Sequence, residues 1–145
     1  MNNVDKLFEV DSIDRDDYFN EHDWTNEELQ NILDRIDYGE SSANNIIVHS
    51  IACHPQTNIE QLKTFALSGK YGAGCIKAVL LNGNCTEEII RAVYNKSADD
   101  PIFSYVKKEN IKKYGEDNWN DWKEGIINGI NNLALDHKNC PGDFK

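Results

Sequence analysis

Apolar residues recur along most of the chain at spacings of three and four residues, which is typical of amphipathic helices. One such apolar face spans residues 29–36 and follows a capping box that runs from Thr25 to Glu28. In this box the threonine side chain accepts from the amide three residues on, and the glutamate side chain accepts in return. No segment alternates apolar and polar residues over a useful length. The pattern therefore predicts an all-α protein.

Two neighbouring segments carry the same pattern 28 residues apart: an apolar helix, a polar turn and a second apolar helix. A weaker copy lies 33 residues upstream and places Thr25 at the Asn58 position. Such units do not bury their own apolar faces, so neighbours must stack. We expect a short right-handed α-solenoid of stacked helix pairs. The matched pairs are Ile47 with Cys75, Val48 with Ile76, Ile51 with Val79, Ala52 with Leu80, His54 with Asn82, Asn58 with Thr86, Leu62 with Ile90 and Phe65 with Val93.

The chain after the repeats predicts a C-terminal helix pair over residues 100–135. Asp100 before Pro101 reads as a helix start, and Gly115 breaks the pair. The tail from residue 137 is expected to be irregular. With an acidic part at residues 1–40 and two clear repeats at 43–96, residues 1–145 are expected to form one domain. The inward face of the last helix is expected to comprise Trp119, Trp122, Ile126, Ile130 and Leu133.

The wording of the repeat resembles the leucine-rich repeat variant family, whose usual phrase is V-R-x-x-V-A-x-N-P-x-T-P. Residues 48–57 follow this phrase closely and residues 76–86 follow it loosely, with His49 and Lys77 at the arginine position and Gly83 for the proline. The resemblance covers about residues 43–96 and implies HEAT-like stacking of helix pairs in a binding scaffold. Some members carry an iron–sulfur cluster, but no clustered cysteine motif supports one here, so no cofactor is expected.

Charge is unevenly distributed along the chain, whose formal net charge is -10. Residues 1–40 hold 13 Asp and Glu against 3 Lys and Arg, whereas residues 41–145 hold 12 of each, so the whole excess lies in the first quarter. Nucleic acid and anionic membranes need a basic surface, so a basic protein partner is expected instead. The residues expected to meet this partner are Asp14, Asp16, Asp17, Glu21, Asp23, Trp24, Glu27 and Glu28.

Candidate chemistry in the sequence is sparse. His49 and Cys53 share a helix face, but further metal ligands are missing nearby, so no metal site is expected. Gly69, Gly72 and Gly74 do not complete a phosphate-binding loop, and we interpret them as a loop and close helix packing. Nothing selects a catalytic thiol and histidine pair. The four cysteines are expected to be reduced and to serve as small apolar residues.

These observations favour a non-enzymatic protein-binding module. Small acidic proteins without chemistry of their own include many bacterial toxin-immunity proteins, so the leading hypothesis is an immunity protein that neutralises a basic, nuclease-type toxin. A nucleic-acid mimic that occludes a DNA-binding enzyme is one alternative, and a general helical-repeat adaptor is another. An enzyme with an unrecognised site is a third. No apolar run reaches the about 18–20 residues that cross a bilayer, and a cytoplasmic location is expected.

Overall fold

The structure is a computed structural model that describes residues 2–144. Within this range the chain forms nine α-helices and two short 3₁₀-helices and has no strand, which confirms the all-α prediction. None of the described helices is long and apolar enough to span a membrane. The elements are α1 (Asn3–Glu9), α2 (Ser12–Asn20), α3 (Asn26–Arg35), α4 (Ser42–Ala52), α5 (Ile59–Leu67), α6 (Ala73–Leu81), α7 (Glu87–Val93), η1 (Pro101–Phe103), α8 (Ser104–Tyr114), α9 (Glu116–Asp136) and η2 (Gly142–Phe144).

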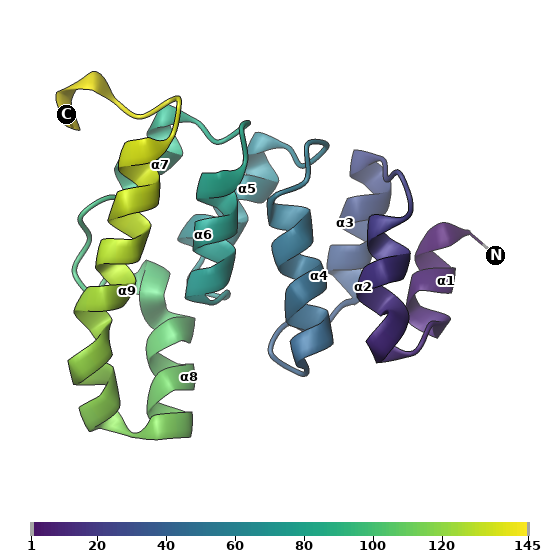
Figure 1. Cartoon of the computed structure of the whole chain (residues 1–145), viewed down its shortest axis with the longest axis horizontal. Coiled ribbons are helices and arrows are strands. Elements are labelled where there is room, and N and C mark those ends of the chain that lie inside the picture. Colours follow the sequence, from purple (N-terminus) through teal and green to yellow (C-terminus); the bar gives the residue numbers. More distant parts are fainter. Residues whose placement is uncertain (1, 145) are drawn as a thin grey trace.

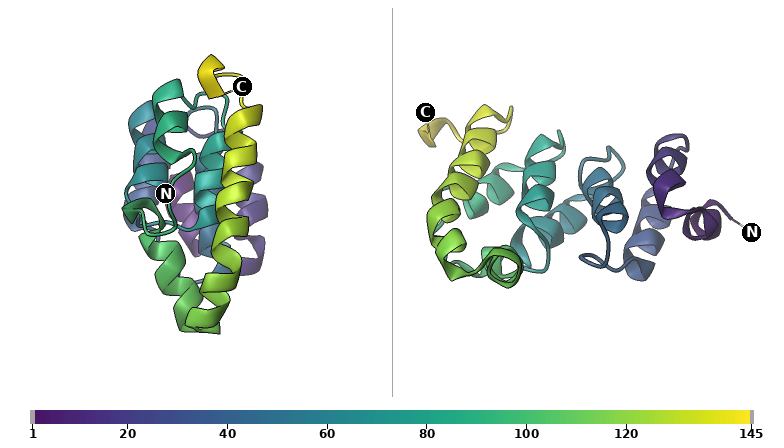
Figure 2. Two further views of the ribbon diagram at one scale, coloured as in Figure 1. Left: turned by 90° about the vertical axis from the view of Figure 1, so that its left-hand side faces the viewer. Right: turned by 60° about the horizontal axis from the view of Figure 1, so that its bottom comes forward.

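The helices lie in two rows with the apolar core between them. Helices α2, α4, α6 and α9 stand side by side in the front row, and α3, α5 and α7 lie behind them (Figure 1). The view along the rows shows the two layers edge-on (Figure 2, left). Helix α1 packs on α2 and α3 at one end, and α8 packs along α9 at the other. The chain ends therefore lie at opposite ends of the rows.

Local capping explains where the rear helices begin. Thr25 Oγ1 accepts from the Glu28 amide at 3.2 Å, Asn58 Oδ1 from the Gln61 amide at 2.9 Å, and Thr86 Oγ1 from the Ile89 amide at 3.3 Å. These three caps sit at the matched positions of the sequence pattern. Each satisfies one of the amides that the first turn of a helix leaves without a partner.

The apolar pairs that the 28-residue spacing matched are all in the core. Each of these side chains, from Ile47 and Cys75 through Phe65 and Val93, is at most 3 % exposed. In the upstream copy, Leu29 and Ile32 are fully buried as well. The repeated pattern therefore marks the positions through which neighbouring helices pack.

The turns that follow α4, α6 and α9 share one hydrogen-bonding scheme. In each turn the first side chain accepts from the backbone N–H two residues on. The pairs are His54 with Gln56 at 3.0 Å, Asn82 with Asn84 at 2.8 Å, and His137 with Asn139 at 2.9 Å. The tail from residue 137, which was expected to be irregular, is therefore a third turn of this kind followed by η2.

Each of the later two turns also donates to the turn before it. Asn82 Nδ2 donates to the carbonyls of Ala52 at 2.9 Å and His54 at 3.0 Å. His137 Nε2 lies 2.9 Å from the Asn82 carbonyl oxygen. Because His137 Nδ1 accepts from an amide, its proton belongs on Nε2, which makes this contact a donation. These buried bonds hold successive front-row helices in register.

Glycines confirm the expectation of a loop and close packing around residues 69–74. Gly69 has φ +73°, and a Cβ there would collide with the Pro101 carbonyl. At Gly74 a Cβ would lie 2.7 Å from the His49 ring. The short glycine-rich stretch thus lets α6 approach α4 closely.

Two expectations about packing were wrong, and one helical segment carried no prediction. Trp122 is 52 % exposed, so it does not belong to the inward face of α9, although Trp119 and Ile130 do. Residues 3–20, for which no helix was predicted, form α1 and α2. Cys53 is exposed, whereas Cys75 and Cys85 are buried and pack as small apolar residues.

Candidate functional site

The acidic residues of the first quarter lie on two helices and the turn between them. Asp14, Asp16 and Asp17 belong to α2, Glu21 caps its C-terminus, and the remainder, Asp23, Glu27 and Glu28, lie in the turn and on α3. Phe19 of α2 and Leu29 of α3 are both buried between the rows. The exposed faces of these two helices therefore point in different directions, and the acids do not form one compact patch.

Three of the acids form a stripe along the outer face of α2. Asp14, Asp17 and Glu21 follow one another at three- and four-residue spacing and are all exposed. Ile13, which is 88 % exposed, lies on the same outward side of the helix. The stripe thus combines three carboxylates with one accessible apolar side chain.

The other acids have different surroundings. Glu28 Oε1 accepts from the Thr25 amide at 3.1 Å as part of the capping box, so its carboxylate supports the helix start. Asp16 accepts from Asn20 Nδ2 at 3.3 Å. The pKa of His54 is lowered by burial, and the nearby Asp23 carboxylate acts in the opposite sense.

Cations do not compensate these acids within the described chain. In residues 2–144, no ion pair joins any of the seven acids to a basic side chain, and Arg35 with Asp5 at 2.7 Å is the pair that the first quarter contains. The Arg15 guanidinium is turned inward, where it donates to Asn44 Oδ1 at 3.1 Å and to the Val10 carbonyl at 3.2 Å. The negative charge of the first quarter is therefore left to solvent.

Trp24 does not belong with the exposed acids. Its side chain is 3 % exposed and stacks on Phe19 with the ring centres 5.4 Å apart. Its indole Nε1 donates to the Phe19 carbonyl at 2.8 Å. Both the apolar surface and the polar atom of Trp24 are used inside the fold, which removes it from the surface that a partner meets.

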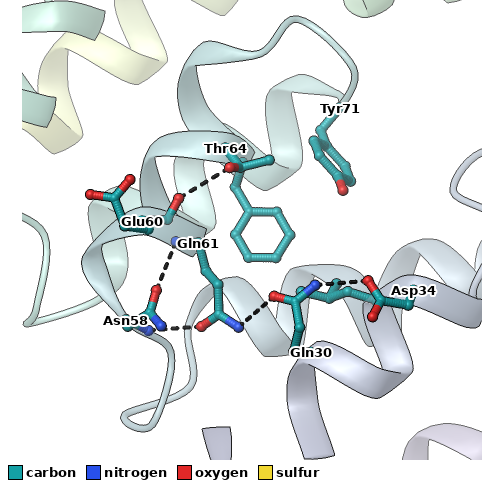
Figure 3. A pocket seen from close by; sticks show the side chains of 9 residues that line it. Gln30, Asp34, Asn58, Glu60, Gln61, Thr64 and Tyr71 are labelled. Atoms are coloured by element: carbon teal, nitrogen blue, oxygen red, sulfur yellow. Dashed lines mark hydrogen bonds between the residues drawn. The ribbon is translucent and has the colours of Figure 1, made fainter. Parts of the chain in front are cut away.

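A pocket between α3 and α5 lies beside this region, and the sequence did not reveal it. It has a volume of about 290 Å³ and opens between Gln30 and Asp34 of α3 and Glu60 of α5 (Figure 3). Its floor is apolar and is formed by Leu33, Phe65 and Tyr71. Gln30 of α3 and Gln61 of α5 are 31 residues apart along the chain, so no local sequence pattern predicts the pocket.

A chain of side-chain amides runs along one wall of the pocket. The backbone N–H of Asn58 donates to Gln61 Oε1 at 2.9 Å, and Gln61 Nε2 donates to Gln30 Oε1 at 3.0 Å. Gln30 Nε2 in turn donates to Asp34 Oδ1 at 2.9 Å (Figure 3). A backbone N–H can only donate and a carboxylate can only accept, so both ends fix the direction of every bond. The chain holds the Asp34 carboxylate at the mouth of the pocket.

His49 and Cys53 have partners within the fold. His49 Nε2 lies 3.0 Å from the Tyr38 hydroxyl, which accepts from the Gly72 amide at 3.1 Å. Burial lowers the pKa of His49. The Cys53 residue is exposed, but its Sγ lies 3.5 Å from the Ala78 carbonyl oxygen, and the partial burial of the sulfur raises the pKa of the thiol, which disfavours the thiolate that a nucleophile requires. Among residues 2–144, no group of three or more His, Cys, Asp or Glu side chains is placed to hold a metal ion.

Comparison with known protein families, curated proteins and solved structures gave no match. The candidate site therefore rests on the geometry of this chain alone.

Proposed function

We propose that this protein is a binding module built from stacked helix pairs, which takes a basic protein partner through the α2 stripe of Asp14, Asp17 and Glu21. The uncompensated charge of this stripe is the observation that carries the proposal. Carboxylates without an internal cation repel one another and add nothing to the stability of the fold, whereas opposite charge on a partner raises the association rate and the specificity.

The arrangement of the helices supports a stacked, short α-solenoid of the kind that the repeated sequence pattern predicts. Matched residues at the 28-residue spacing lie in the core, and the turns of the front row are hydrogen-bonded to one another. Stacked helix pairs offer long outer faces of a rigid scaffold to partners. The leading physiological role is that of an immunity protein, with a basic nuclease-type toxin as its partner.

Nucleic-acid mimicry is the alternative in which these acids imitate phosphates. It calls for two spaced lines of exposed acids. The acids of α2 form one stripe, and those of α3 face another way. This geometry favours the protein-binding module.

The test is capture of the tagged full chain with its partner from native lysate at low salt, followed by elution with a salt gradient and mass spectrometry. One variant carries Asp14→Lys, Asp17→Lys and Glu21→Lys. The matched control carries Asp121→Lys, Glu124→Lys and Asp136→Lys, which change the net charge equally at three exposed acids of α9.

We expect the α2 variant to lose a basic partner that the α9 variant retains, with circular dichroism showing both folded. Equal loss by the two variants would contradict a site on α2. A toxin among the captured proteins allows a direct assay: co-expression of this protein should protect cells from the toxin, and the α2 variant should not.

A further inference from the structure

We propose that the pocket between α3 and α5 binds the side chain of an arginine that the basic partner presents. This inference rests on the proposed function for the identity of the partner, but the pocket itself is argued from its own geometry. Its volume of about 290 Å³ is roughly ten times the ~30 Å³ that one water molecule occupies in the liquid, which accommodates a side chain of seven heavy atoms.

The pocket combines an apolar floor with an acidic mouth. Leu33 offers surface to an aliphatic stem, and Phe65, which is 2 % exposed, closes the floor. The half-buried Tyr71 ring also lines the pocket, where a planar cation can contact it. Asp34 and Glu60 are both exposed, and the Glu60 carboxylate points away from Asp34 (Figure 3). No lysine, arginine or histidine is among the residues that line the pocket.

The two carboxylates at the mouth are largely without internal cations. The nearest ammonium to Glu60 is that of Lys63 at 3.9 Å, and Lys63 lies closer, at 3.3 Å, to Glu88. Asp34 takes part in no ion pair within residues 2–144. A cation entering this pocket thus meets the unpaired Asp34 carboxylate, and Glu60 adds negative charge from the side of α5 (Figure 3).

The amide chain favours arginine over lysine. Gln30 Nε2 donates to one oxygen of Asp34, so the carboxylate is oriented and keeps its second oxygen for an incoming donor. The directed chain leaves Gln30 and Gln61 with their carbonyl oxygens already accepting. A fixed, planar carboxylate beside an aromatic ring matches the planar guanidinium, which pairs with carboxylates and stacks at once, better than a rounded ammonium group.

The test uses nuclear magnetic resonance of the ¹⁵N-labelled full chain with three capped tripeptides, acetyl-Gly-X-Gly-amide, in which X is arginine, lysine or citrulline. Citrulline keeps the shape of arginine but has no charge. We expect the arginine peptide to shift the side-chain NH₂ signals of Gln30 and Gln61, the lysine peptide to bind more weakly, and the citrulline peptide to leave the signals unchanged.

Two matched variants separate the pocket from general negative charge. Asp34→Asn should weaken binding of the arginine peptide by about fivefold, the upper range for an exposed ion pair. Asp37→Asn removes an exposed acid three residues away that does not line the pocket, and it should leave binding unchanged.

Equal loss in the two variants, or equal binding of arginine and citrulline, would overturn the proposal. Failure of the pocket is distinct from failure of the proposed function. If the α2 variant loses the partner while the arginine peptide shows no pocket binding, the module stands and the pocket proposal is wrong. If the peptide binds in the pocket while the α2 variant keeps its partner, the pocket proposal stands and the α2 site is wrong.

Discussion

The two ends of the molecule treat charge in opposite ways. Towards the C-terminus, Arg91 bridges Glu87 at 2.9 Å and Asp143 at 2.6 Å, and Lys113 pairs with Glu109 at 3.0 Å. In the first quarter the acids outnumber the cations fourfold, and Arg35 with Asp5 is the ion pair described there. Charge at the C-terminal end is balanced within the chain, whereas the charge at the N-terminal end is unbalanced and faces solvent, which is the observation behind the proposed partner site.

The exposure of the tryptophans also differs between the two ends. Trp24, at the acidic end, is buried against Phe19, whereas Trp122 is half exposed and lies beside Tyr114 with ring centres 5.7 Å apart. The acidic end thus has a firm apolar core beneath a charged surface. The N-terminal half of α9 extends beyond the two rows and has α8 as its neighbour (Figure 1).

The largest expected effect comes from exchanging these tryptophans for alanine. Trp24→Ala should lower the free energy of unfolding by about 3–5 kcal/mol, because it empties a core site and removes the bond to Phe19. Trp122→Ala should change it by about 0.5 kcal/mol, as an exposed substitution does. Urea unfolding measures both, and similar losses would contradict the contrast between the two ends.

The next largest loss of stability is expected from removing an asparagine that donates to the carbonyls of a turn. Asn82→Ala leaves the buried carbonyl of Ala52 and the partly buried carbonyl of His54 without their donor and should cost about 1–3 kcal/mol of unfolding free energy. Asn26→Ala, at the acidic end, also removes two donations, but the Gln56 carbonyl that it frees belongs to an exposed residue that water can reach. Its loss should be clearly smaller in the same urea experiment, and a larger loss would show that the acidic end depends on its turn bonds.

Acid should act on the packed centre between the two ends. Burial lowers the pKa of His49 in the folded chain, whereas a histidine of the unfolded chain has a pKa of about 6.5. The folded chain therefore binds fewer protons than the unfolded chain as the pH falls. Stability is therefore fully present above that pH and falls as the pH drops through it. His49→Gln should flatten the loss between pH 7 and 5, as followed by thermal unfolding; an unchanged slope would assign the loss to other groups.

The smallest effects belong to the surface charges themselves. Asp17→Asn relieves repulsion from Asp14 and Glu21 and should raise the free energy of unfolding by about 0.3 kcal/mol. Arg91→Gln breaks the bridges to Glu87 and Asp143 and should lower the melting temperature slightly. Both shifts should vanish in about 1 M salt, where the screening length is about 3 Å. Shifts of the same sign would contradict the charge contrast between the ends.

Features that depend on short stretches of sequence were predicted best. The cap at Thr25 was predicted correctly because a cap and its amide lie three residues apart, and Thr86 was correctly predicted to open a helix. The second capping box was predicted from Thr57 to Glu60, which is one residue too early, because Asn58 and Gln61 form it. The matched core positions followed from the repeat, since equivalent residues meet equivalent neighbours. Helix α2 was not predicted because it buries Phe19 alone among its apolar residues, which leaves no apolar period to detect. Helix α1 has seven residues and buries Val4 and Leu7, which is too short a pattern to identify a helix.

Features that depend on distant neighbours were not predicted. Trp122 fits the spacing of an apolar face, but its neighbour there is α8, whose Tyr114 covers the ring in part and leaves Trp122 52 % exposed. The turn at His137 shares the spacing of Asn and Cys with the turn at Asn82, since Asn139 and Cys140 match Asn84 and Cys85. This similarity could have predicted the turn. The acidic character of the first quarter was visible in the sequence, whereas the stripe on α2 and the pocket at Asp34 required the helices to be placed in space.

The direction of the bonds between turns has a consequence for how the chain is made. Asn82 donates to carbonyls of the turn at residues 52–54, and His137 donates to the carbonyl of Asn82. A chain that leaves the ribosome N-terminus first presents each set of acceptors before the donor that needs them has been synthesised. Each of these two turns can therefore form its bonds to the preceding turn as soon as it has been synthesised, without waiting for a later part of the chain.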